Sequence, residues 1–335
     1  MKTQKILLGH GSGGILTHKL IKEVFLKRLK NPVLEELGDS AYIDYREKIA
    51  FTTDSFVVSP LFFPGGDIGK LAVCGTINDL TVMGAQPEYL SLALIIEEGL
   101  DFSLLEKIAD SIALTARKAG VAIATGDIKV VERGACDKLF INTAGIGRLI
   151  SRKKLSPKNL VPGDKVIITG NIGQHGLAVL ARRQSLDLNF HIQSDCAALN
   201  HLLLPLLKQT QAVKFMRDPT RGGLATTLNE VTQSCGLGIE LEEKAIPISS
   251  QVRAACELLG IDPLYVANEG AAVLVVRKDA AGQVLRFLKK NPLAKNAKII
   301  ATVVKEHPGK VVLRTLLDTR RIVEMLTSEP LPRIC

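Results

Sequence analysis

The first half of the chain alternates between hydrophobic patterns of helical and of strand period. Leu16, Leu20, Ile21, Val24 and Phe25 recur at the three- and four-residue spacing of an amphipathic helix. Apolar runs of strand length follow, and a second helical pattern separates them. The pattern predicts strands over 49–53, 88–96, 121–125 and 140–146, and a helix over 104–112.

A charged, proline-containing stretch over 151–164 interrupts this pattern, and its turn signal at Pro162 and Gly163 marks a domain boundary. We expect an N-terminal domain over 1–150, a C-terminal domain over 151–320 and a tail over 321–335. In the second half the pattern predicts strands over 165–169, 238–241, 271–277, 299–304 and 311–314, and helices over 175–183, 196–208, 221–234, 249–259 and 279–290. Both halves are therefore of mixed α+β type.

Composition excludes several classes of function. The 335 residues are 46% hydrophobic, which suits filled cores, but no apolar run approaches the roughly 18 residues of a membrane span. The first residues lack the apolar region of a secretion signal, so we expect a cytoplasmic protein. The net charge is +9, yet the absence of Trp and an aromatic content of 4% argue against single-stranded nucleic acid as a partner. The six cysteines are scattered, which argues against a zinc site or a disulfide framework.

The sequence closes on a proline-stiffened segment that carries a cysteine, Cys335. Proline favours an extended backbone, so the segment from Glu329 onward can reach roughly 20 Å at about 3.1–3.3 Å per residue. A thiol on such a tail is typical of a carrier arm that enters a pocket. The alternative is a frayed end without a function, which is the commoner case for chain termini.

Four aspartates, Asp54, Asp79, Asp127 and Asp218, are expected at loop or element-terminal positions, where carboxylates suit Mg²⁺. Taken singly, each is better explained as a turn or N-cap residue. Three glycine-rich loops accompany them, over 9–14, 170–176 and 218–223, and each precedes a predicted helix whose N-terminus can hold an anion. The combination predicts a nucleotide together with Mg²⁺.

With these motifs the chain resembles the HypE family of hydrogenase maturation proteins. This family belongs to the superfamily of aminoimidazole ribonucleotide (AIR) synthetase, selenophosphate synthetase and thiamine-monophosphate kinase. The resemblance covers essentially the whole length. It rests on HGSGG at 10–14, TDSF at 53–56, GDIGK at 66–70, NDL at 78–80, GDIKVV at 126–131, MRDPTRGG at 216–223, NEG at 268–270 and PRIC at 332–335. Ile128 departs from the family, which usually has threonine there.

The resemblance implies a two-domain PurM/AIR synthetase-like α+β fold whose N-terminal sheets pair across a homodimer. It also implies an ATP-dependent dehydration of an S-carbamoyl group on Cys335 to S-cyanide, a source of iron cyanide ligands. The partners would be the carbamoyltransferase HypF and the HypC–HypD iron scaffold complex. The resemblance implies nucleotide contacts by Gly11, Gly13, Gly14, Lys70, Asn78, Asp127, Arg221 and His175, and Mg²⁺ ligands at Asp54, Asp79, Asp127 and Asp218.

The proposed chemistry places two demands on other residues. The α-carboxylate beside the Cys335 thiol should raise the thiol pKa, so a cation must compensate, and Arg333 and Lys129 are the candidates. Dehydration also needs a base, for which we choose Glu269, with Lys129 as the next catalytic candidate. A surface loop carboxylate is the equally weighted alternative for Glu269.

Two other classes of function stay open. Within the superfamily, the chain could be a phosphotransferase or synthetase for a free small molecule, although such a reaction does not need Cys335. From another class, it could be a nucleotide-dependent scaffold whose tail docks into a partner. ATP hydrolysis that depends on carbamoylated Cys335 would separate these readings.

Overall fold

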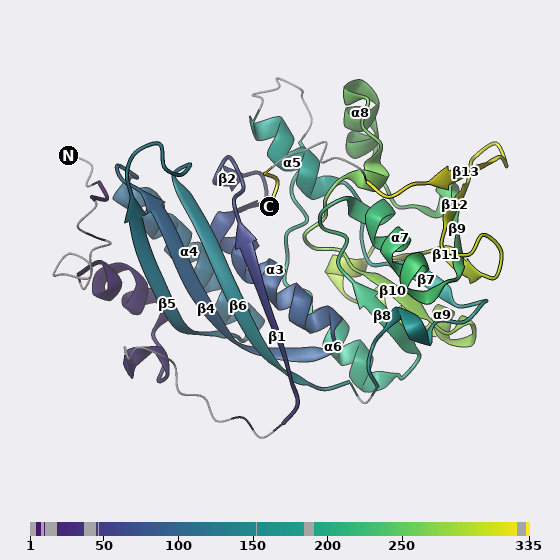
Figure 1. Cartoon of the computed structure of the whole chain (residues 1–335), viewed down its shortest axis with the longest axis horizontal. Helices are drawn as coiled ribbons and strands as arrows, with labels where there is room; N and C mark the ends of the chain where they lie inside the picture. Colours follow the sequence, from purple (N-terminus) through teal and green to yellow (C-terminus); the bar gives the residue numbers. More distant parts are fainter. Residues whose placement is uncertain are drawn as a thin grey trace.

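The first domain is built on a mixed four-stranded sheet, and the computed structural model shows it beside a larger second sheet (Figure 1). The structure describes residues 5–7, 10, 19–36, 45, 47–151, 153–183, 191–326 and 333–335. The first sheet has the order β1-β6-β4-β5, with β4 and β5 parallel and the other pairs antiparallel. Its strands are β1 (Ile49–Phe56), β4 (Ala85–Glu97), β5 (Ala122–Val131) and β6 (Leu139–Leu149).

Two helices, α3 (Ile68–Val82) and α4 (Phe102–Ala119), cover one face of this sheet (Figure 1). Helix α4 is amphipathic, as its sequence pattern predicts, and Gly120 caps its C-terminal end. Helix α3 is not predicted, because nearly all its side chains are buried and leave no helical period to read. Asp67 begins it by accepting from the amides of Gly69 and Lys70.

The opposite face of the first sheet carries apolar side chains that are open to solvent in this chain. Phe51 on the edge strand β1 is 68% exposed, and Ile49 and Ile95 are also exposed. A sheet face of this kind is typical of a surface that a partner covers. The remaining elements of this domain are short: a π-helical segment (Ile21–Leu26) with α2 (Lys27–Leu29), a 3₁₀ turn (Leu34–Glu36), β2 (Phe62–Phe63) and β3 (Gly66–Asp67).

The second domain contains a seven-stranded sheet in the order β13-β12-β9-β11-β7-β10-β8. Only the pairing of β12 with β9 is parallel. Its strands are β7 (Lys165–Ile168), β8 (Val213–Arg217), β9 (Gly238–Glu242), β10 (Val273–Val276), β11 (Lys298–Val304), β12 (Val311–Arg314) and β13 (Arg320–Val323). The predicted α+β fold with two domains is confirmed.

Helices pack on both faces of this second sheet, since α7 lies in one core cluster with it and α6 and α9 in the other. The helices are α5 (Gln174–Arg183), α6 (Asn200–Gln209), α7 (Gly223–Cys235), α8 (Ser250–Leu259) and α9 (Ala281–Leu288). Short 3₁₀ turns connect them at Pro157–Asn159, Glu243–Ala245, Pro263–Tyr265, Lys278–Ala280 and Pro292–Ala294. Among the helices in the described ranges, none is long and apolar enough to cross a bilayer.

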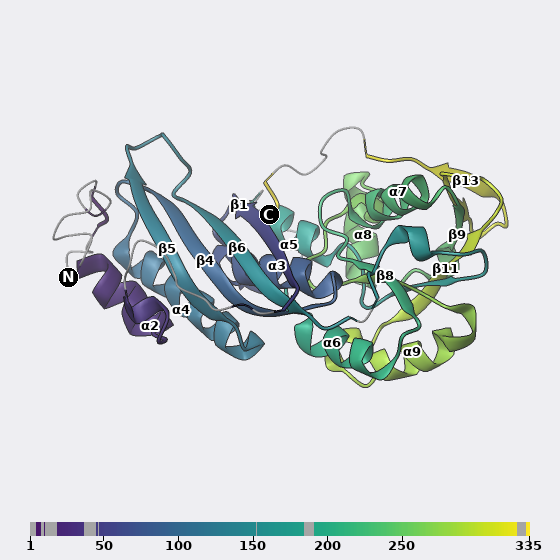
Figure 2. The ribbon, with the colours of Figure 1, turned by 60° about the horizontal axis from the view of Figure 1, so that its bottom comes forward.

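One hydrophobic core joins the two domains. It contains the interior of the first domain together with side chains of α5 and α8, and Ile334 and Cys335 belong to it. The second view shows the C-terminal residues lying between the two domains, next to α5 and β1 (Figure 2). The end of the chain is therefore packed into the junction between the domains.

Candidate active site at the domain junction

The tail residues Arg333 to Cys335 are docked by hydrogen bonds to their main-chain oxygens. The Arg333 oxygen accepts from the Ser59 amide at 3.3 Å and from Arg183 Nη2 at 2.5 Å. The Ile334 oxygen accepts from His175 Nε2 at 2.9 Å, and the Cys335 oxygen accepts from the Val57 amide at 3.2 Å. Cys335 is 9% exposed, so the thiol rests inside the protein rather than on an exposed arm.

The Cys335 sulfur accepts a hydrogen bond from Arg221 Nε at 3.4 Å. Burial raises the pKa of the thiol to about 11, Glu269 adds to this increase, and Arg221 opposes it. Arg221 is therefore the cation beside the sulfur, and the expectation of Arg333 or Lys129 in that position is wrong.

Both of the expected cations lie against other groups. Arg333 pairs with Asp137 at 2.9 Å and lies over the Phe140 ring. Lys129 pairs with Asp127 at 3.0 Å. Residues 221 and 335 lie far apart in the sequence, so no local pattern predicts the contact that forms between them. This contact depends on how the two domains pack.

Glu269 lies in the loop before β10 and is only 2% exposed, which excludes a surface loop carboxylate. Burial raises its pKa well above the usual value, and Asp218, Asp195 and Asp54 raise it further. A buried glutamate of this kind holds a proton more tightly than a surface glutamate and is a stronger base once ionised. Its charge raises the pKa of the Cys335 thiol, so the two side chains lie within electrostatic reach of each other.

The main chain of Glu269 is fixed by Asp195, a partly buried residue that sequence reasoning missed. Asp195 accepts from the amides of Glu269 at 3.2 Å and Gly270 at 2.9 Å. A side chain at position 270 would collide with the main-chain oxygen of Asp195, so only glycine fits there. Burial raises the Asp195 pKa to about 6. The only sequence signal was an aspartate just before the predicted helix over 196–208.

Asn78 joins the two domains at the same place. Its side-chain amide donates to the main-chain oxygens of Ala197 at 3.0 Å and Glu269 at 3.3 Å, and its oxygen accepts from the Leu199 amide at 2.9 Å. These bonds satisfy most of its capacity within the protein. Asn78 therefore positions the loop of Glu269, and its expected contact with the nucleotide stays a prediction.

Three of the predicted metal-binding aspartates interact electrostatically: the charge of Asp54 raises the pKa of Asp79, and both raise the pKa of Asp218. Asp218, which follows β8, has its pKa raised to about 7 by burial and by Asp79. Burial also raises the pKa of Asp54 in β1 and of Asp79 in α3. These aspartates were expected at loop or element-terminal positions: Asp218 lies in the loop after β8, Asp54 lies two residues before the end of β1, and Asp79 lies in the last turn of α3.

Asp127 is separate from this group within one chain. It lies in β5, level with Asp54 in β1, and two strands separate them, so the two backbones are roughly 14 Å apart at ~4.8 Å per strand. A single cation held by all four aspartates of one chain is therefore excluded.

The acidic cluster of Asp54, Asp79 and Asp218 is chemically suited to Mg²⁺. Among the side chains that the structure describes, no set of three or more metal-binding groups has the geometry to hold an ion by itself. Mg²⁺ usually takes one or two carboxylates and completes its shell with water and phosphate oxygens. The raised pKa values of Asp79 and Asp218 reflect neighbouring negative charge that a cation would relieve, so the residues fit this mode.

The other predicted nucleotide contacts fall in several places. Gly11, Gly13 and Gly14 lie outside the described residues. Lys70 is in the first turn of α3 and donates to the Gly65 oxygen at 2.8 Å. His175 is fully buried on α5 between Ser194 Oγ at 2.8 Å and the tail, so its observed partner is the tail.

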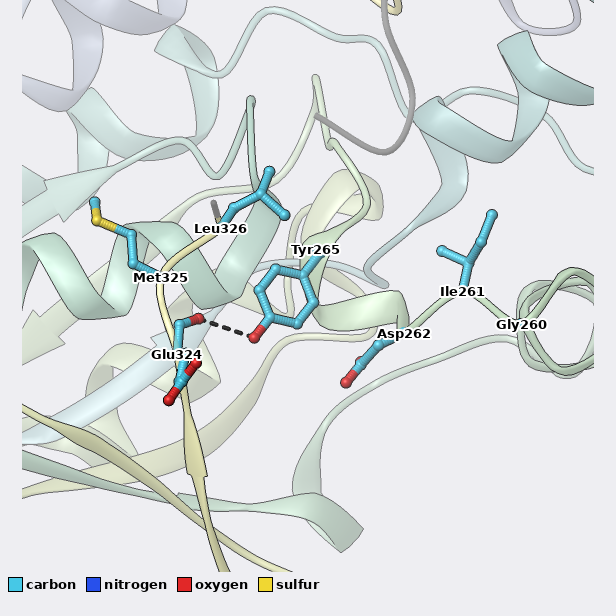
Figure 3. A pocket seen from close by; sticks show the side chains of 7 residues that line it. All are labelled: Gly260, Ile261, Asp262, Tyr265, Glu324, Met325 and Leu326. Atoms are coloured by element: carbon cyan, nitrogen blue, oxygen red, sulfur yellow. Dashed lines mark hydrogen bonds between the residues drawn. The ribbon is translucent and has the colours of Figure 1, made fainter. Parts of the chain in front are cut away.

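A pocket of about 300 Å³ opens elsewhere in the second domain (Figure 3). Tyr265 crosses it and donates to the Glu324 oxygen at 2.8 Å, as the dashed line in Figure 3 marks. Leu326 lines the same pocket just before the segment over 327–332. The pocket therefore lies beside residues 324–326, near the start of the tail, and its lining includes neither Glu269 nor Arg221.

Comparison with known proteins agrees with the two-domain fold. Residues 37–149 match the N-terminal domain of AIR synthase related proteins, and residues 161–314 match the C-terminal domain. Carbamoyl dehydratase HypE of Rhodobacter capsulatus is 45% identical over 100% of this chain and 99% of its own.

Solved structures give the same picture. A HypE structure in complex with ATP matches with a TM-score of 0.95 and 45% identity, over 98% of this chain and 99% of that one. The HypE chain of a HypE–HypF complex matches with a TM-score of 0.81 and 46% identity, over 92% of this chain and 99% of that one. Two domain matches and full-length identity of this level leave one assignment: the chain belongs to the HypE family of carbamoyl dehydratases within the AIR synthase related proteins.

Proposed function

We propose that this chain is an ATP-dependent carbamoyl dehydratase of [NiFe]-hydrogenase maturation that acts on its own Cys335. The observation that carries the proposal is the docked Cys335 thiol, which accepts a hydrogen bond from Arg221 and lies within electrostatic reach of buried Glu269. A phosphotransferase or synthetase for a free small molecule needs no such thiol. A docking scaffold needs no buried base beside it.

The reaction converts the S-carbamoyl group on Cys335 to S-cyanide. ATP transfers its terminal phosphoryl group to the carbamoyl oxygen, the C–O bond then breaks, and that oxygen leaves in inorganic phosphate. The two N–H bonds also break, and their protons pass to the base and to phosphate. The balance is S-carbamoyl cysteine and ATP to S-cyanocysteine, ADP, phosphate and a proton. Phosphorylation is needed because an amide oxygen is a very poor leaving group.

The residues of the chain have separate roles in this step. Arg221 holds the sulfur, and ionised Glu269 takes a proton from the carbamoyl nitrogen. Asp195 and Asn78 fix the main chain of Glu269. Asp54, Asp79 and Asp218 would hold Mg²⁺, which neutralises phosphate charge when it is bound. Lys70 and the glycines at 11, 13 and 14 remain the proposed phosphate contacts.

The partners follow from the family. A relative has been solved as a HypE–HypF complex, which supports a HypF-type carbamoyltransferase as the source of the carbamoyl group. A HypC–HypD iron scaffold would accept the cyanide. The exposed apolar face around Phe51 supports a homodimer that pairs two first-domain sheets. The proposed setting is the cytoplasm, and the domain limits at 150 and 320 remain part of the proposal.

Replacement of the base tests this function directly. In Glu269→Gln the amide keeps the shape of the carboxyl but cannot take a proton. The variant should accept a carbamoyl group on Cys335 and bind ATP, and it should then accumulate the carbamoyl form, about 18 Da heavier than the cyano form. Intact-protein mass spectrometry after incubation with ATP, Mg²⁺ and a carbamoyl donor system measures the difference.

The matched control is Glu306→Gln, which changes an exposed glutamate and should behave as wild type. If Glu269→Gln reaches the cyano mass at the wild-type rate, the base lies elsewhere and Lys129 is the next residue to test. If wild-type protein hydrolyses ATP without any change at Cys335, the dehydratase proposal itself fails.

A further inference from the structure

The docked tail is held through groups that any polypeptide end would offer. Each of the three main-chain oxygens over 333–335 accepts a hydrogen bond from the domain junction. The donors are the amides of Val57 and Ser59 and the side chains of His175 and Arg183. Recognition of successive main-chain groups is how proteins commonly bind an extended peptide.

The side chains of the tail add a sequence preference. Arg333 donates from Nε to the Val57 oxygen at 3.0 Å, pairs with Asp137 at 2.9 Å and lies 5.8 Å from the centre of the Phe140 ring. Ile334 is 2% exposed within the apolar core that joins the domains. The site therefore selects a basic residue, then an aliphatic residue, then cysteine.

The receiving groups are also fixed by contacts outside the tail. His175 is bound by Ser194 Oγ at 2.8 Å and lies edge-on to the Phe63 ring at 5.3 Å between ring centres. Ser194 is itself anchored by its amide, which donates to the Pro64 oxygen at 2.8 Å. Arg183 donates from Nε to the Ser59 oxygen at 2.8 Å. A site whose donors are held in this way is pre-organised for its ligand.

We propose that these groups form a peptide-binding site, named here the tail site (Val57, Ser59, Asp137, His175 and Arg183), which accepts a separate polypeptide end of the form Arg-aliphatic-Cys. The dehydration then proceeds in trans: an S-carbamoyl peptide and ATP give an S-cyano peptide, ADP, phosphate and a proton. The natural source of such an end is a second copy of this chain. This inference rests on the proposed function.

The attached tail is the main competitor of a free peptide. A segment tethered beside its site has an effective concentration in the millimolar range. The test therefore uses the full-length chain with Arg333→Glu and Cys335→Ser, which places a negative charge beside Asp137 and removes the thiol. Removal of the ion pair and the Val57 hydrogen bond should weaken docking of the attached tail about tenfold or more.

The probe is a synthetic peptide, acetyl-Pro-Arg-Ile-Cys, that carries an S-carbamoyl group, at up to about 5 mM to match the tethered competitor. With this variant, ATP and Mg²⁺, we expect the peptide to lose about 18 Da as the cyano form appears. A matched peptide with Glu in place of Arg should react about tenfold more slowly or less. A chain that also carries Asp137→Arg should prefer the Glu peptide, because the charge pair is restored in reverse.

The same conversion assay is carried out in parallel on wild-type protein whose own Cys335 is carbamoylated. If wild type converts its own tail and the peptide stays unconverted at 5 mM, the inference is overturned while the proposed function stands. Conversion of both peptides at equal rates, without reversal by Asp137→Arg, also overturns the assignment of the tail site. If wild type fails on its own tail, the proposed function is at fault.

Discussion

Reactivity of Cys335 toward an alkylating reagent reports directly on the docked thiol. The pKa of this group is raised from 9.0 to about 11. Only the thiolate reacts, so at pH 8 the reactive fraction falls from roughly 10% to roughly 0.1%. Docking should therefore slow alkylation about 100-fold relative to an undocked tail.

The pH dependence follows from the same shift. A thiol whose pKa is higher in the docked state stabilises docking below pH 9, and this contribution is lost as the pH rises from 9 through 11. Two pKa units correspond to about 2.7 kcal/mol at 1.36 kcal/mol per unit. In the docked tail the rate of alkylation should still rise tenfold per pH unit between 8 and 10, whereas an undocked tail should level off near pH 9.

Iodoacetamide labelling followed by peptide mass spectrometry measures these rates between pH 7 and 10. Arg333→Glu supplies the reference with weakened docking, because the carboxylate repels Asp137 and removes the ion pair that helps to hold the tail. A rate at Cys335 that equals this reference at every pH, with a plateau near 9, would refute the docked, buried thiol.

Three further outcomes are expected. Asp79→Asn should weaken binding of Mg²⁺-ATP, since an amide is a poorer ligand for a hard cation; an unchanged calorimetric titration with Mg²⁺ would show a purely structural role. Burial lowers the His175 pKa from 6.5 to about 4, so the unfolded chain binds a proton that the folded chain does not, and stability should fall by about 3 kcal/mol between pH 6.5 and 4. Urea unfolding should show this loss, and His175→Gln should lack it. Asp195→Asn should reduce kcat and leave the affinity for ATP unchanged. The acid limb of its pH–rate profile should shift to lower pH, because removal of a negative neighbour lowers the pKa of Glu269. A wild-type kcat and pH–rate profile would show that Asp195 does not position the base.

Sequence patterns were sufficient for elements with a clear period or a clear boundary. The strands expected over 49–53, 88–96 and 140–146 and the helix over 104–112 all form within longer elements. Helix α3 was missed because burial on every side leaves no polar face, so the sequence pattern could not show that Asp79 lies in the last turn of a helix. Strand β8 was missed as well, since its five residues follow a long apolar helix without a turn signal that separates them clearly.

The site could be predicted only as a set of residue types. Cys335, Glu269 and Arg221 were singled out, and the structure brings all three together. Their mutual roles depend on contacts across more than 60 residues of sequence, and no local pattern encodes such contacts. The pairing of Arg221 with the sulfur and the support of Glu269 by Asp195 are of this kind.

The hydrogen bonds of Asn78 affect how the enzyme folds during synthesis. Its partners lie 119, 121 and 191 positions further along the chain. Contacts of such long range form late and slow the folding of a domain. During synthesis the side chain of Asn78 lacks part of its hydrogen bonds until the loop of Glu269 has been made. The junction that carries the active site therefore folds only after both domains have been synthesised. The first domain expressed alone would bury an unsatisfied amide or expose α3, which would promote aggregation.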